Sequence, residues 1–183
     1  MIEFKAKQTG TMARRLRRDV RGLAAIEFAL IAGFLSVSVL NVADVAVFLF
    51  DKLQVNNATQ MGAQAAWATC DLNHVPATTR CPTMNAAVTT AVQSTSLGNA
   101  VTVQAGYPAE GWYCVNSSGT LQYMADYANP PADCTTAGVP LGEPDDYVKI
   151  QTTYDYSPIF PGLSVASVFP AHIVSTSYVR LAG

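Results

Sequence analysis

The sequence of 183 residues has few charged groups: Asp, Glu, Lys and Arg make up 13% of it, where a soluble domain has about a quarter. It also has only two histidines, His74 and His172, and it contains no G-x-S-x-G, P-loop or H-E-x-x-H motif. A Ser-His-Asp set would have to be assumed, so we expect no enzymatic activity. Each histidine is interpreted as a surface or half-buried polar residue.

Metal-binding motifs are missing as well, because no C-x-x-C pair occurs and the histidines lack the spacing of a zinc site. The sequence therefore predicts neither a metal site nor a cofactor. Five carboxylates around the segment 127–146 offer an alternative, a calcium-binding loop, but their spacing matches no EF-hand and a solvated acidic loop is favoured. These carboxylates are Asp126, Asp133, Glu143, Asp145 and Asp146.

What the sequence does have is a basic head followed by a long apolar run. Residues 1–22 hold seven of the eleven basic residues, whereas the rest of the chain holds eleven of the thirteen acids. Between Gly22 and Phe50 the only charged residues are Glu27 and Asp44, and about 20 apolar residues suffice to cross a bilayer as a helix. By the positive-inside rule the bases stay in the cytoplasm and the rest is exported. Nucleic-acid binding by these bases is the less favoured alternative.

These features divide the chain into three parts: a cytoplasmic leader at residues 1–22, a transmembrane helix at residues 23–50 and an extracytoplasmic domain at residues 51–183. A cleavable secretory signal is the competing interpretation. Its apolar region would be about 7–15 residues long, so a retained anchor is preferred. Asp44 fits the anchor if it lies near the far interface or faces protein.

The helix is expected to continue to residue 69, because no proline interrupts the segment and an apolar stripe follows the helical period. A second helical pattern follows Pro82, and Gly98 stands where that helix should stop. The stripe of the first helix is Val55, Ala58, Met61, Ala65 and Ala68, and that of the second is Met84, Val88, Ala91, Val92 and Thr95.

Beyond Gly98 the pattern alternates with a period of two and predicts four to five strands. The segments 127–146 and 157–170 are rich in turn-forming residues and are expected to be surface loops. The extracytoplasmic domain is therefore predicted to be α+β, with the long helix packed against an antiparallel sheet. The strands are expected within residues 101–105, 112–117, 121–124, 148–156 and 173–181.

The four cysteines all follow the apolar run, in the part expected to be exported, and their even number predicts two disulfides. Four cysteines allow three pairings. We favour Cys70 with Cys81 and Cys114 with Cys134, because each of these bonds closes one local segment.

Glu27 is the sharper signal, because a carboxylate at the centre of a membrane span costs about 2.5–3.5 kcal/mol and is a functional candidate by default. The alternative places Glu27 at the interface, in the first turns of the helix, where the helix dipole mildly favours an acid.

The start of the chain resembles type IV prepilins, which have a basic leader, a glycine, a glutamate five residues later and then an apolar helix. Here the glycine is Gly22 and the glutamate is Glu27. The variant resembles the TadE-like pseudopilins (TadE/TadG family) of tight-adherence (Tad/Flp) pilus systems, as does the segment Val148–Leu163 with the final strand.

The resemblance implies a pilin-like fold and a non-enzymatic minor pseudopilin of the bacterial inner membrane. A prepilin peptidase would cut between Gly22 and Leu23, and Glu27 would then pair with the new amine of Leu23 in its own or a neighbouring subunit. Further partners would be other pilin subunits and the inner-membrane assembly platform, in support of surface adhesion. Lateral helix contacts would use small or polar residues, namely Gly33, Ser36, Ser38 and Asn41.

Two other classes of function are alternatives. The first is a signal-anchored periplasmic module that binds a ligand on an aromatic-rich sheet, and the second is a membrane-tethered hydrolase, against which the scarcity of histidine counts. The aromatic residues of the first alternative are Trp112, Tyr113, Tyr123, Tyr147, Tyr154 and Tyr156.

Overall fold

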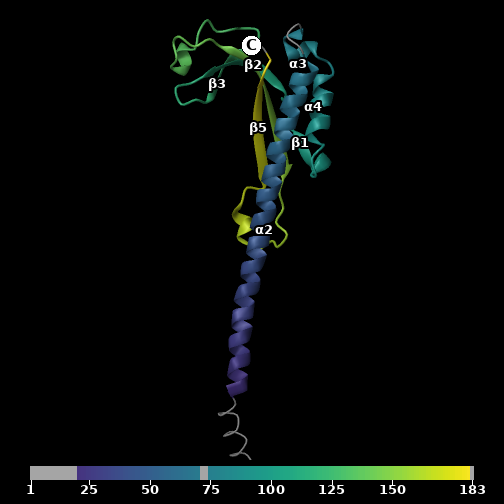
Figure 1. The fold of residues 1–183 in the computed structure, drawn as a ribbon, viewed down its shortest axis with the longest axis vertical. Coiled ribbons are helices and arrows are strands. Elements are labelled where there is room, and N and C mark those ends of the chain that lie inside the picture. Colours follow the sequence, from purple (N-terminus) through teal and green to yellow (C-terminus); the bar gives the residue numbers. More distant parts are fainter. Residues whose placement is uncertain (1–19, 71–73, 182–183) are drawn as a thin grey trace, which may run out of the picture.

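The computed structural model describes residues 20–70 and 74–181, so most of the expected basic leader lies outside the described residues. A single long helix carries a domain of two further helices and an antiparallel sheet at its upper end (Figure 1). The fold is α+β, as the sequence predicts.

The long helix α2 runs without a break over Val20–Thr69. Its 50 residues correspond to about 75 Å at 1.5 Å per residue. The lower part exposes large apolar side chains, whereas the upper part packs against the sheet and against helix α4. Within the described ranges it is the helix long and apolar enough to cross a membrane.

The buried side of upper α2 differs from the predicted stripe. Val55 and Ala58 are buried as expected, but Met61 is exposed and Gly62 is buried in its place. The cause is a close approach to α4: a Cβ added at Gly62 would lie 2.8 Å from Cγ2 of Val92. The smallest residue, not the most apolar one, therefore faces the neighbouring helix.

Two short helices follow α2. Helix α4 spans Met84–Val92 and buries Met84, Val88 and Val92, three of the residues predicted to share a face. Helix α3, Ala77–Arg80, was not predicted, since four residues are too few to show a helical period.

The sheet has five strands, all antiparallel: β1 Val101–Val103, β2 Ala109–Val115, β3 Leu121–Asp126, β4 Asp145–Asp155 and β5 His172–Arg180. The central strand is β4. It pairs with β5 along one edge and with β1 and β2 along the other, and β3 lies beyond β2. Short 3-10 turns interrupt the connections at Gly98–Ala100 (η2), Thr135–Ala137 (η3) and Val165–Val168 (η4).

One face of the sheet packs on α2. Alternate residues of β4, including Val148, Ile150 and Thr152, are fully buried on this face. The hydroxyl oxygens of Thr59 on α2 and Thr152 lie 2.6 Å apart and satisfy each other inside the apolar core. This pair sets the helix against the middle of β4.

Candidate functional site

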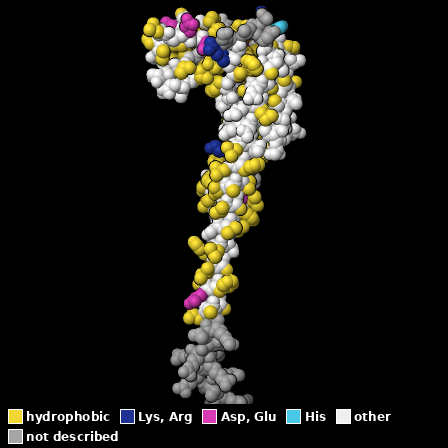
Figure 2. All heavy atoms as spheres, viewed as in Figure 1, with side chains coloured by type: hydrophobic (Ala, Val, Ile, Leu, Met, Phe, Trp, Pro, Cys, Tyr) yellow, Lys and Arg dark blue, Asp and Glu magenta, His cyan; other side chains and the backbone are white. Residues whose placement is uncertain are grey.

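The residues of the prepilin motif lie on the exposed beginning of α2. Gly22, Leu23 and Glu27 are all within the helix and all exposed. Figure 2 shows hydrophobic side chains along this lower part of the molecule. Among the residues that the structure describes, Glu27 therefore lies on an exposed, apolar stretch of helix away from the sheet.

Some of the small and polar residues expected to serve lateral helix contacts already form hydrogen bonds within the chain. The hydroxyls of Ser36 and Ser38 donate to the carbonyl oxygens of Ala32 and Phe34 in their own helix, at 2.7 and 2.9 Å. Gly33 is exposed, with open space at the position of a Cβ. Of this set, Gly33 remains the residue best placed for close approach of another helix.

Asp44 faces protein, one of the two conditions under which it fits the anchor. Its carboxylate is fully buried and accepts hydrogen bonds from the backbone N–H groups of Ile159 and Phe160, at 2.9 and 3.3 Å. One turn below, Oδ1 of Asn41 accepts from the N–H of Val165 at 2.7 Å. Both side chains hold the connection between β4 and β5 against the helix.

This connection, residues 157–170 and hereafter the β4–β5 loop, lies beside the middle of α2 below the sheet (Figure 1). The loop contains η4, and the ring of Phe169 packs at a tilt of 34° against that of Phe48 on α2, with ring centroids 4.6 Å apart. The sequence predicted a loop here but gave no sign that it docks on the apolar run. The signal that was available is that the whole segment 157–171 has no charged residue.

The two disulfides join the pairs that the sequence favours. Cys70–Cys81 links the end of α2 to the segment before α4, and Cys114–Cys134 links β2 to the long loop. Disulfides of this kind persist in oxidising compartments, so the two bonds indicate an oxidising compartment for the domain.

The five carboxylates of the acidic segment do not meet at one point. Asp145 pairs with Arg180 at 2.6 Å, and Asp126 accepts a hydrogen bond from the hydroxyl of Tyr123. Asp133 accepts from the hydroxyl and N–H of Thr135, which lowers the pKa of its carboxyl. Among the described residues, no three acidic, histidine or cysteine side chains converge in a way that could hold a metal ion.

Asp146 has an environment unlike that of the other carboxylates. It is almost fully buried, and no donor reaches either carboxylate oxygen. The carboxylate of Glu110 lies on the same face of the adjacent strand, and it can bond to Asp146 only if one of the two carries a proton. Burial, followed by the charge of Glu110 and a shared hydrogen bond, raises the pKa of Asp146 to about 7.

Glu110 has a structural partner besides Asp146. Its two carboxylate oxygens accept hydrogen bonds from the N–H groups of Ala77 and Thr78, at 2.9 and 3.0 Å. These are the first N–H groups of α3, so Glu110 ties this helix to β2. Glu110 therefore holds α3 and faces the buried Asp146 at the same time.

The aromatic residues named for the alternative ligand-binding module lie on both faces of the sheet. Tyr113, Tyr123 and Tyr147 cluster on the face turned away from α2, but Tyr154 and Tyr156 point toward α2. The cause is the alternation of side chains along a strand, which places odd and even positions on opposite faces. Trp112 belongs to neither group and stacks on Tyr127.

The tyrosine rings of this face pack against one another. Tyr113 is buried at its centre and meets Tyr123, Tyr147 and Tyr178 edge-on, with ring centroids 5.5, 5.9 and 5.4 Å away. Burial, with smaller effects of the neighbouring tyrosines, raises the pKa of Tyr113 to about 12. The geometry is that of a packed cluster and leaves no open aromatic platform at Tyr113.

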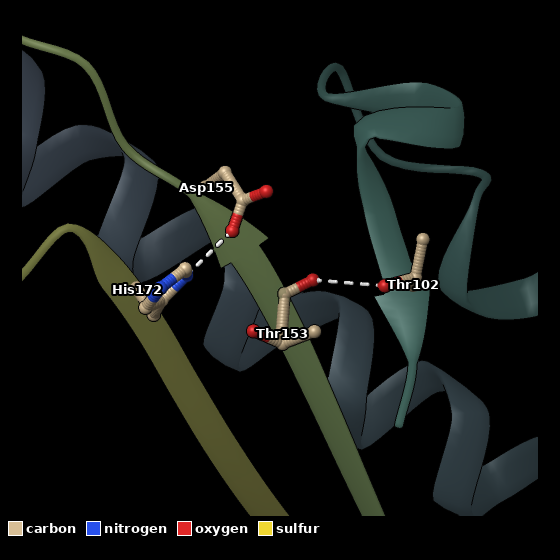
Figure 3. Close-up of polar contacts among 4 residues, drawn as sticks. All are labelled: Thr102, Thr153, Asp155 and His172. Carbon is tan, nitrogen blue, oxygen red and sulfur yellow. Dashed lines mark hydrogen bonds and ion pairs between the residues drawn. The ribbon is translucent and has the colours of Figure 1, made fainter. Parts of the chain in front are cut away.

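The two histidines lie apart. His172 begins β5 and its Nδ1 lies 2.6 Å from Oδ1 of Asp155, its partner across the strand pair (Figure 3). His74 lies in the connection between α2 and α3. Figure 3 also shows that the hydroxyl of Thr102 donates to the backbone carbonyl of Thr153, at 3.5 Å. Among these four residues the histidine activates no nucleophile.

No family model, curated protein or solved structure matches this chain. The assignment of a function therefore depends on the prepilin-like motif and on the geometry described above.

Proposed function

We propose that the chain is a non-enzymatic minor pseudopilin of a tight-adherence (Tad/Flp) type IV pilus system, of the TadE-like kind. The observation that carries the proposal is the make-up of α2. An exposed apolar half that begins with Gly22 and Glu27 continues, without a break, into a half packed on an antiparallel sheet. One helix thus combines a membrane anchor with the spine of an exported domain.

In this function a prepilin peptidase cuts between Gly22 and Leu23 and frees the amine of Leu23. Glu27 lies four residues from Leu23, which is one helical turn, so the two groups neutralise each other within a subunit or between neighbours. Either charge alone is expensive in lipid, and the pair is less so. The subunit would sit in the inner membrane with its domain in the periplasm, available to other pilin subunits and the assembly platform.

The two alternatives have less support. A ligand-binding module would need an open aromatic surface, and the tyrosines fill their own cluster. A hydrolase would need a histidine beside a nucleophile, and the ring of His172 lies against the carboxylate of Asp155 across the strand pair.

The first experiment is an intact-mass measurement on protein extracted from membranes of cells that contain the peptidase. We expect a chain that begins at Leu23, and Gly22→Ala should retain the leader. A mature chain that begins at Met1, or one cut after Phe50, would contradict the proposal.

The second experiment tests Glu27. Glu27→Gln should leave expression, processing and both disulfides intact but reduce the number of pili and of adherent cells, because the Leu23 amine loses its partner. Lys52→Gln, which removes one exposed charge from the same helix outside the span, is the matched control and should be silent. Normal piliation with Glu27→Gln would favour the interfacial interpretation of this acid.

A further inference from the structure

We propose that the β4–β5 loop enters the extracytoplasmic leaflet of the membrane beside α2 and contacts lipid with its exposed apolar side chains. The inference rests on the membrane anchorage proposed above and adds a second lipid contact to it.

The first argument is the surface of the loop. Four of its large apolar side chains are more than half exposed: Ile159 at 54%, Leu163 at 64%, Val165 at 55% and Val168 at 80%. The segment 157–171 has no charged residue, so no charge in the loop opposes its entry into lipid. A contiguous apolar surface of this kind marks a contact site.

The second argument is the height of the loop along α2. Asn41 and Asp44 fix the loop to the helix, and Asn41 lies 18 residues after Leu23. That separation is about 27 Å along a helix, close to the roughly 30 Å of a hydrocarbon core. If the span begins at Leu23, the loop lies where the core ends on the far side.

The third argument is the state of the loop's backbone. Irregular backbone is tolerated at membrane depth only where its polar groups are satisfied by protein. Asp44 takes the N–H groups of Ile159 and Phe160, Asn41 takes that of Val165, and the hydroxyl of Ser164 takes that of Ala166. Two polar residues in an apolar run thus remove the cost of bringing this loop to lipid.

The fourth argument is where charge resumes. Asp155 and His172 stand at the two ends of the loop, paired across the strands, with side chains 83% and 71% exposed. Below this pair, Figure 2 shows hydrophobic side chains of the loop beside those of α2, and no charged residue of the loop separates the two surfaces. This continuity with a helix surface suited to lipid identifies lipid, not a second copy of the chain, as the occupant.

The test uses the full chain in vesicles whose acyl chains carry bromine, which quenches tryptophan on contact. Trp is introduced at Val168 or Leu163 in the loop, at Leu35 in the span and at Val115 on β2, each an exposed position. The native Trp67 and Trp112 give a constant background, measured on the parent protein. Protein is kept dilute relative to lipid so that copies do not meet.

We expect strong loss of fluorescence with V168W, L163W and L35W and no added loss with V115W. If L35W is quenched but V168W and L163W are not, the anchor stands and the loop proposal is overturned. The apolar surface of the loop would then contact protein instead of lipid. If L35W is not quenched either, the membrane anchorage itself fails and the loop proposal with it.

Discussion

Replacement of Asp146 by Asn tests whether a buried acid is protonated in the folded domain. Folded Asp146 keeps its proton up to a pKa of about 7, whereas the unfolded chain releases it near the ordinary value of 3.8. Between these values the folded state binds more protons, so the free energy of unfolding falls as pH rises. Below pH 4 both states are protonated and the loss disappears.

The magnitude follows from the width of that window. Each pKa unit corresponds to about 1.4 kcal/mol, so the full shift is worth at most about 4 kcal/mol, and relaxation of the site lowers this. Asn has the shape of the protonated acid and can donate to Glu110, but it cannot ionise. We therefore expect Asp146→Asn to match the wild type near pH 4 and to be the more stable protein at pH 8.

The assay is thermal unfolding of the full chain in detergent micelles, followed by near-ultraviolet circular dichroism between pH 4 and pH 8. Glu143→Gln, which removes an exposed carboxylate from the same segment, is the control for the change in charge and should reproduce the wild-type profile. Parallel profiles for Asp146→Asn and wild type, or a variant that is less stable at pH 8, would refute a proton held between Asp146 and Glu110.

Two further substitutions test the packing of α2. Gly62→Val should lower the free energy of unfolding by about 1–3 kcal/mol, because its Cβ would lie 2.8 Å from Val92; Ala68→Val, exposed on the same helix, should have little effect in the same thermal assay. Asp44→Ala leaves two N–H groups of the β4–β5 loop without an acceptor, at about 1–3 kcal/mol each, so chymotrypsin should cut after the exposed Leu163 faster than in wild type. Equal cleavage rates would show that Asp44 does not hold the loop.

The regular elements were predictable because each carries a local signal. The unbroken apolar run gives α2, and the alternation in 148–156 gives β4, which the structure extends to Asp145–Asp155. The local closure of each cysteine pair gave the disulfides. These features depend on neighbours in sequence, where periodicity and loop length are informative.

The features that the sequence did not reveal depend on contacts between distant segments. Gly62 is on the buried side because Val92 approaches it. The pKa of Asp146 is raised by burial and by Glu110, which faces it from the adjacent strand. The sequence showed an aromatic-rich sheet but not that Tyr147 and Tyr154 of β4 lie on opposite faces of it. Composition identifies such residues as notable without telling what they meet.

Glu27 and Asp44 show the same limit within a single helix. Both are carboxylates in one apolar run, and the rule that a charge in lipid is costly applies equally to each. The structure separates them, because Asp44 is buried and bonded to the N–H groups of its own chain, whereas Glu27 is exposed on a bare stretch of helix. The cost of Asp44 is thus met by folding. The cost of Glu27 has to be met from outside the folded domain, which is the requirement that assembly with a newly exposed amine would satisfy.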